Sequence, residues 1–583
     1  MVFMKALFPS HPWTARARVV VFAAICLLPL SGATRANAQT WTNNTTGTWN
    51  WGDGGNWEDE NAPANPADEP VLFDPGAINL TVVLNTEGDQ ILRQGLELRQ
   101  RTSVPGLVTM DLQGKKLILD GGALVLNAND SAKTPLTVAA FSSGTVQLGT
   151  TEKAADLLLG IEGMRNTANT KTMLFAAGST LDTFHTANLL ISTDGGSQSK
   201  NYALDLSAAN LRSGEAEKTL AVTDTLSIAQ SWVDTPTTDL RTKVGALKLG
   251  VVSTLAIGKD LIVGQYQRGE TGGNSLTEVA GTFDFAAANP EPVSMTVGRD
   301  LRIGVGDRAT GAILNAPATL HLAIGTEQTA VEDRGVIQIG YKNQSQGTVN
   351  PDGATSGSFV GGAEGGTFSA FVAELRIGQN TRAGGSATGL LDFRHATLEQ
   401  MVITGDAVIG DGVNAAGSLH LNGGVVTSDN LVVGNVTGSE TSLLSLDGTH
   451  WQVAGPLLVG GLGEIRLDIR NANGGIDLAS DQAIDLTIQS GGLIRAQFHA
   501  PAGNETLWAI RMAGDQQERF QLYLDNDRLV AEGEYGSLAT LFYDGVHTYY
   551  GIAAIPEPSV AALFGLIAGA IALGRVKANR KRG

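Results

Sequence analysis

The chain has 583 residues, of which 73 are glycine and only 6% are aromatic, and its formal net charge is −18. An acidic surface of this kind repels phosphate backbones and anionic lipids, so we expect no nucleic-acid partner. The single cysteine, Cys26, excludes an internal disulfide. A long, glycine-rich chain with few aromatic residues favours repetitive β structure over a globular enzyme.

Residues 1–38 have the pattern of a secretory signal peptide. Three basic residues precede an apolar run at 19–30, and Ala36-Asn37-Ala38 then offers a small-residue cleavage site. We therefore predict that the chain is exported. Its mature form would contain no cysteine, because Cys26 lies within the apolar run.

The segment 39–76 gathers Trp41, Trp49, Trp51 and Trp57 within 17 residues. One interpretation is a hydrophobic cap over the open end of a repeat protein. The alternative is a platform on which sugar rings stack. The segment resembles the N-terminal opening of secreted proteins of the autotransporter-associated β-strand kind, and this resemblance implies a β-solenoid.

A short unit recurs along residues 77–475. It consists of an apolar residue, any residue, Ile or Val, and then Gly, as in Leu301-Arg302-Ile303-Gly304 and Leu375-Arg376-Ile377-Gly378. Its two apolar positions are two residues apart, so both face one side of a strand and the intervening Arg faces the other. We expect the glycine to allow a corner with positive φ.

The spacing of these units predicts the fold class. Successive glycines from Gly264 to Gly460 are 24 to 40 residues apart, with further strand-like segments between them. Such a period suits stacked β coils with loops of variable length. We predict an all-β protein whose exported part is an irregular parallel β-helix, or solenoid.

The segment 476–554 has a different pattern. Longer segments alternate apolar and polar residues, among them Phe520–Leu524, and Asp525-Asn526-Asp527 indicates a turn between two strands. The stretch Leu541–Tyr550 is rich in aromatic residues. We predict an antiparallel β domain that caps the C-terminal end of the solenoid.

The last segment, 555–583, has three parts in order. Pro556-Glu557-Pro558 is a stiff spacer, an uncharged apolar run follows at 560–573, and the chain then becomes basic. An apolar run of this length is short for a bilayer and relies on its flanking residues. The basic residues would keep the tail on the cytoplasmic side; they are Arg575, Lys577, Arg580, Lys581 and Arg582.

This order resembles the PEP-CTERM sorting signal of Gram-negative bacteria. The resemblance covers only 555–583, and here the basic end mixes Lys with Arg. It implies a precursor held in the inner membrane, an exosortase as processing partner, and delivery to the cell surface or an exopolysaccharide matrix. The alternative is an ordinary single-pass tail anchor.

The sequence offers little that indicates catalysis. A β-helix polysaccharide lyase or hydrolase would need clustered carboxylates on adjacent coils, and the best local candidate is Asp392-Phe393-Arg394-His395. His420 and His450 occur singly. We therefore expect a non-enzymatic surface or matrix protein without cofactor or metal. The alternatives are the β-helix enzyme and a glycan-binding adhesin that uses the Trp-rich segment.

Overall fold

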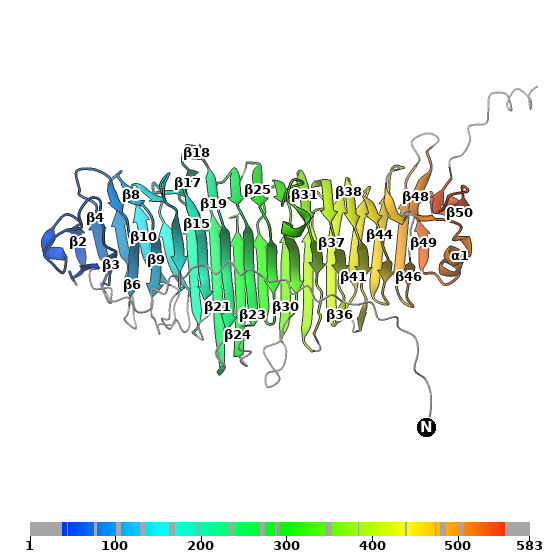
Figure 1. The fold of residues 1–583 in the computed structure, drawn as a ribbon, viewed down its shortest axis with the longest axis horizontal. Helices are drawn as coiled ribbons and strands as arrows, with labels where there is room; N and C mark the ends of the chain where they lie inside the picture. The colour runs from blue at the N-terminus through cyan, green and yellow to red at the C-terminus, as the bar shows by residue number, and fades with distance from the viewer. Residues whose placement is uncertain are drawn as a thin grey trace, which may run out of the picture. The chain divides into compact units, whose positions relative to one another are not determined.

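The computed structural model describes residues 38–553 except 44, 75–77, 101–105, 129–135, 162–169, 195–197, 234–236, 269–274, 286–288, 290, 344–352, 383, 438–439, 473, 479–484 and 501–504. The chain divides into two compact units, Met1–Ala38 and Gln39–Gly583. All the described strands belong to the second unit, and in Figure 1 they follow one another in chain order from blue to orange.

The second unit is built as a solenoid, because nearly all its described strands pair in parallel. One coil consists of β26 (Leu301–Val305), β27 (Ala309–Leu314) and β28 (Thr319–Ile324). The next coil repeats the order with β29 (Val336–Tyr341), β30 (Ala354–Val360) and β31 (Gly365–Val372). Each strand pairs in parallel with its counterpart one coil later.

Repetition of this coil gives three sides. Within the described residues, the first sheet has 15 strands, from β1 (Gln39–Trp41) to β46 (Leu486–Ile488). The second has 16 strands, from β2 (Gly47–Asn50) to β49 (Leu529–Glu532). The third side starts as a six-stranded sheet and continues from β19 (Thr219–Val222) as a 12-stranded sheet. The predicted all-β parallel solenoid is confirmed.

One continuous hydrophobic core runs through these coils, from Trp41 to Ile552. The repeat unit explains it, since Leu301 and Ile303 are fully buried whereas Arg302 between them remains partly exposed. Leu375 and Ile377 are buried in the same way around Arg376. The predicted alternation of inward and outward side chains is thus confirmed at both positions.

The repeat glycines have two distinct roles. Gly304 and Gly378 have φ of 59° and 60°, as predicted for a corner. Gly258 and Gly460 belong to the same sequence pattern but have no positive φ, so the prediction is wrong for them. They are required because a Cβ would lie only 2.1 Å from Thr223 O and 2.3 Å from Gly434 O, respectively.

A second row of glycines crosses the second sheet in register. These residues face the backbone of the first sheet, and they are Gly245, Gly281, Gly311, Gly357, Gly389 and Gly417. A Cβ on Gly311 would lie 2.1 Å from Val263 O, and one on Gly357 would lie 2.4 Å from Gly340 N. The two sheets therefore approach each other at backbone distance along this row.

The C-terminal end differs in part from the prediction. β47 (Leu493–Phe498) and β48 (Leu507–Ala513) still pair in parallel with the preceding coil. Antiparallel pairing begins where β48 meets β51 (His547–Ile552), which also pairs with β50 (Thr540–Tyr543). The antiparallel part of the end is therefore the three-stranded group of β48, β51 and β50.

The segment predicted as a strand at Phe520–Leu524 is a helix, α1 (Gln517–Asp525). Phe520 and Tyr523 are three residues apart, so one helix face buries both against the core while Leu522 is exposed. The Tyr523 hydroxyl also donates a hydrogen bond to Leu486 O at 2.8 Å. The turn at Asp525-Asn526-Asp527 consequently joins a helix to β49 and not two strands.

Candidate functional site

The Trp-rich segment is packed inside the first coil. Trp41, Trp51 and Trp57 are at most 1% exposed, and Phe73 lies among them. Trp41 stacks on Phe73 with centroids 5.2 Å apart, and Trp51 meets Trp57 edge-on at 5.2 Å. Such geometries are those that aromatic rings favour in protein cores.

This burial bears on the two interpretations of the segment. The faces of Trp41, Trp51 and Trp57 are covered by one another and by Phe73, so they are closed to a sugar ring. Trp49 is partly exposed, and its Nε1 donates to Thr45 O at 3.2 Å. The packing therefore favours the cap and leaves Trp49 as the remaining candidate for stacking.

The candidate Asp392-Phe393-Arg394-His395 lies where β33 (Ser386–Asp392) ends. Arg394 Nε donates to Asp392 Oδ1 at 2.9 Å, and the backbone N–H of Arg394 donates to the same oxygen. Burial raises the pKa of Asp392, but these hydrogen bonds outweigh it and lower the pKa overall. A carboxylate held in this way is an acceptor and a poor general acid.

The two single histidines lie on outer strand positions. His420 is the cross-strand neighbour of Asp392, and burial lowers its pKa despite that carboxylate. His450 begins β42 (His450–Val453) and meets Trp508 edge-on at 5.4 Å. Within the described ranges, no group of three or more His, Cys, Asp or Glu is arranged to hold a metal ion.

The sorting residues lie outside the described residues. This applies to Pro556, Glu557 and Pro558, to the basic tail and to residues 1–37 of the predicted signal peptide 1–38. In the part of the chain that the structure describes, no helix combines the length and apolar character needed to cross a membrane.

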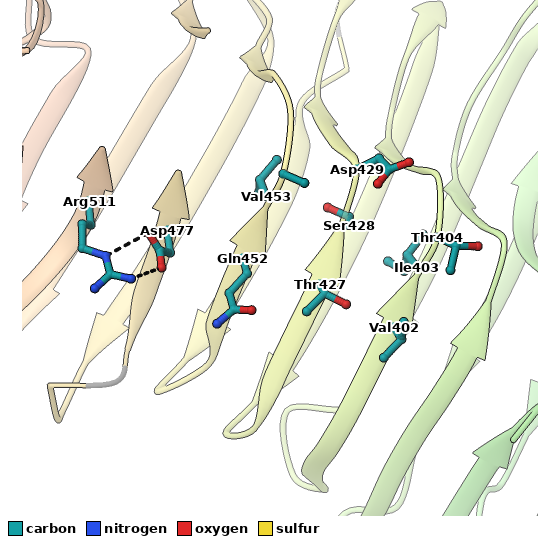
Figure 2. Close-up of a pocket in the computed structure, with 11 residues that line it drawn as sticks. Val402, Ile403, Thr404, Thr427, Ser428, Asp429, Gln452, Val453, Asp477 and Arg511 are labelled. Atoms are coloured by element: carbon teal, nitrogen blue, oxygen red, sulfur yellow. Dashed lines mark hydrogen bonds and ion pairs between the residues drawn. The ribbon is translucent and has the colours of Figure 1, made fainter. Parts of the chain in front are cut away.

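A groove of about 600 Å³ lies on the outer face of the third sheet (Figure 2). Its floor crosses β34 (Thr397–Ile403), β38 (Val425–Ser428), β42, β45 (Gly475–Leu478) and β48. Corner residues complete its lining, among them Thr404, Asp429 and Ala454.

The strand register explains why the floor residues form one row. Val402 pairs with Thr427, Thr427 with Gln452, Gln452 with Asp477, and Asp477 with Arg511. Cross-strand partners point to the same side of a sheet, so all five side chains face the groove. The close-up shows Thr427, Gln452, Asp477 and Arg511 on successive strands.

Asp477 and Arg511 form a fixed ion pair at one end of the groove. Arg511 Nε donates to Asp477 Oδ1 at 2.9 Å, and its Nη2 pairs with Oδ2. The Arg511 guanidinium also lies 5.3 Å from the centroid of the Trp508 ring, within cation–π distance. Asp477 is only 7% exposed, so both partners are held in one geometry.

This pairing sets the charge state of Asp477. Burial raises the pKa of Asp477, but His450 and Arg511 outweigh it and lower the pKa to about 2. His450 Nε2 is 3.7 Å from Asp477 Oδ2, which is beyond hydrogen-bond distance, so we assign most of the effect to Arg511. Asp477 therefore serves as a permanent anion and hydrogen-bond acceptor near neutral pH.

Sequence reasoning did not identify this groove. Its residues come from five coils whose lengths differ, so their register cannot be read from spacing. The available signal was the repeated outward position of each strand in the third sheet, of which Gln452 and Arg511 are examples.

No family model, curated protein or solved structure matches the chain significantly. The class of the protein is therefore defined by its fold alone, an all-β parallel solenoid.

Proposed function

We propose that this chain is an exported, non-enzymatic protein of the cell surface or extracellular matrix of a Gram-negative bacterium. Its role is structural or adhesive within an exopolysaccharide matrix. The C-terminal tail around Pro556-Glu557-Pro558 is its sorting signal and is recognised by an exosortase. The apolar run anchors the precursor in the inner membrane until then.

The observation that carries the proposal is a single core that is covered at both ends. The tryptophans close the first coil, and Phe520 and Tyr523 of α1 close the last. Covered ends keep a stack of coils from adding further strands at its open edges. Such a body presents long side faces to its surroundings, which suits a matrix or surface component.

The deciding experiment measures the mass of the mature C-terminus in producing cells with and without an active exosortase. We expect cleavage near Pro556-Glu557-Pro558 and release to the surface only when the exosortase is active. An intact tail in both strains, or the full chain in the cytoplasm, would contradict the proposal.

The adhesive role has specific support in the groove on the third sheet. It places the partly exposed Thr427 and the exposed Gln452 in one row with the Asp477–Arg511 ion pair, whereas three of the four tryptophans are buried. We therefore assign the glycan-binding role to the groove and not to the Trp-rich segment.

A further inference from the structure

The row of the groove continues beyond it in both directions. Phe371 of β31 pairs with Val402 and extends the row at its N-terminal end. Arg511 pairs with Tyr549, and Tyr549 pairs with Phe542, at the other end. Eight strands at about 4.8 Å spacing place Phe371 and Phe542 about 34 Å apart. The row is thus polar in the middle and aromatic at both ends.

Each aromatic end is partly exposed and packed with its neighbours. The Arg334 guanidinium lies 5.9 Å from the Phe371 centroid. Phe542 and Tyr549 stack with centroids 4.9 Å apart and planes at 6°. All three rings keep part of their surface open, unlike the tryptophans of the first coil.

The middle of the row has hydrogen-bonding groups available to a ligand. Among the described residues, neither the Thr427 hydroxyl nor the Gln452 amide has a hydrogen-bond partner, and both line the groove. Arg511 uses Nε and one Nη2 hydrogen on Asp477 and also interacts with the Tyr549 hydroxyl, and its guanidinium has five N–H donors in all. The floor therefore offers both donors and acceptors, from the Thr427 hydroxyl, the Gln452 amide and the Arg511 guanidinium.

The charge of the groove selects against polyanions. Its charged lining consists of Asp429, Asp477 and Arg511, so it carries no excess of positive charge. The whole chain adds a repulsive field, with a net charge of −18. A peptide strand is also disfavoured, because extended peptides bind by pairing with a free sheet edge. Here the backbone beneath the row is already paired on both sides.

We propose that this row is a binding site for a neutral, extended polysaccharide that lies across the strands. The strand spacing sets one hydrogen-bonding side chain under each successive sugar, and the aromatic ends contact the chain where it leaves the groove. This inference rests on the proposed function for the presence of such a glycan around the protein. The site itself is independent of how the protein is sorted.

The test uses cellohexaose, a neutral glucose hexamer, as probe against the purified full chain in titration calorimetry. A galacturonic acid hexamer and an extended ten-residue peptide serve as comparison probes. We expect cellohexaose to bind and Gln452→Ala to weaken that binding about five-fold, the effect of one lost hydrogen bond. Thr427→Arg should fill the groove and weaken binding more than about ten-fold.

Matched controls lie on the same sheet, outside the groove. Thr296 is an exposed outward residue of β25 (Val293–Val297). Thr296→Ala and Thr296→Arg therefore introduce the same two side chains as the groove variants at a position outside the groove. Both should bind like the wild type, and equal melting temperatures across all variants would establish that the fold is intact.

Three outcomes would overturn the inference. These are absence of cellohexaose binding at millimolar concentration, equal binding by the wild type and Thr427→Arg, and tighter binding of the acidic hexamer or the peptide than of cellohexaose. None of these results changes the expected cleavage at the C-terminal tail. The inference and the proposed function can therefore fail separately.

Discussion

At the residue scale, the ion pair of Asp477 makes stability depend on acid pH. The pKa of Asp477 falls from 3.8 to about 2 on folding. A depressed pKa contributes stability that is fully present above the unfolded value and is lost as pH falls through the folded value. We expect this contribution, about 2 kcal/mol, to disappear between about pH 4 and pH 2.

The variant Asp477→Asn should reproduce this loss at neutral pH. Denaturant unfolding at pH 7 and pH 3 would show a smaller difference for the variant than for the wild type. Asp429→Asn is the matched control, because Asp429 is exposed on the same groove. An equal pH dependence in wild type and Asp477→Asn would show that Arg511 does not hold the carboxylate ionised.

The tryptophans of the first coil permit a second residue-scale prediction. Trp57 is 1% exposed, and its Nε1 donates to Trp51 O at 2.9 Å, so Trp57→Ala should lower the free energy of unfolding by about 3–5 kcal/mol. Trp49→Ala, at the partly exposed position, should change it by less than about 1 kcal/mol. Denaturant titration measures both. Similar losses for the two variants would contradict a cap built on three buried rings.

The composition of 39–76 made a cap predictable, because clustered tryptophans in an aromatic-poor chain need a buried environment. Which of the tryptophan rings are buried and which stays exposed was not predictable. Trp49 and Trp51 are two residues apart, yet Trp51 follows the end of β2 and turns into the core while Trp49 stays partly exposed. That difference depends on where the strand ends, which composition does not specify.

At the scale of the element, the glycine row of the second sheet sets how closely two sheets approach. A Cβ on Gly357 would lie 2.2 Å from Ile303 O, so Gly357→Ala should destabilise the protein by about 3 kcal/mol or more. Gly88→Ala is the control, since a Cβ added to Gly88 would have no atom within 4 Å and Gly88 has no positive φ. It should change stability by less than about 0.5 kcal/mol. Thermal unfolding measures the stability of both variants. If Gly357→Ala were as stable as the wild type, the backbones of the two sheets would not be in close contact at this row.

The coils were predictable and the helix was not, for a physical reason. The apolar–x–apolar–Gly unit occurs many times, so the strand assignment does not depend on any single ambiguous copy. The parallel strands of the first sheet could therefore be located from sequence. Phe520–Leu524 occurs once and is five residues long. Its Phe, Leu and Leu also fit a strand, and only the burial of Phe520 with Tyr523 distinguishes the two.

The groove lay beyond sequence reasoning at this scale as well. The extended row from Phe371 to Phe542 depends on the register of eight strands, and each register depends on the length of the loops between them. The bulge at Phe368 and Ser369 shifts the pairing of β31 with β34 by one residue. Without that shift, a different residue of β34 would join Phe371 in the row.

At the scale of the whole molecule, a solenoid of nearest-neighbour contacts should tolerate the loss of one complete coil. Leu375 pairs with Ala407 and Ile377 with Ile409, so removal of residues 375–406 joins equivalent positions of consecutive coils. The register of the first sheet is preserved, and the remaining coils keep their partners. We expect a soluble, folded protein with a lower free energy of unfolding, because stability is a sum over repeats and interfaces.

Removal of residues 375–391 is the matched control, since it ends within β33 and joins a first-sheet strand to a second-sheet corner. Its inward and outward residues would no longer alternate in phase with their neighbours, which exposes core side chains. Circular dichroism and solubility distinguish the two deletions. Equal loss of structure in both would mean that the coils do not fold as exchangeable units, and the stability of the molecule would then depend on contacts beyond adjacent coils.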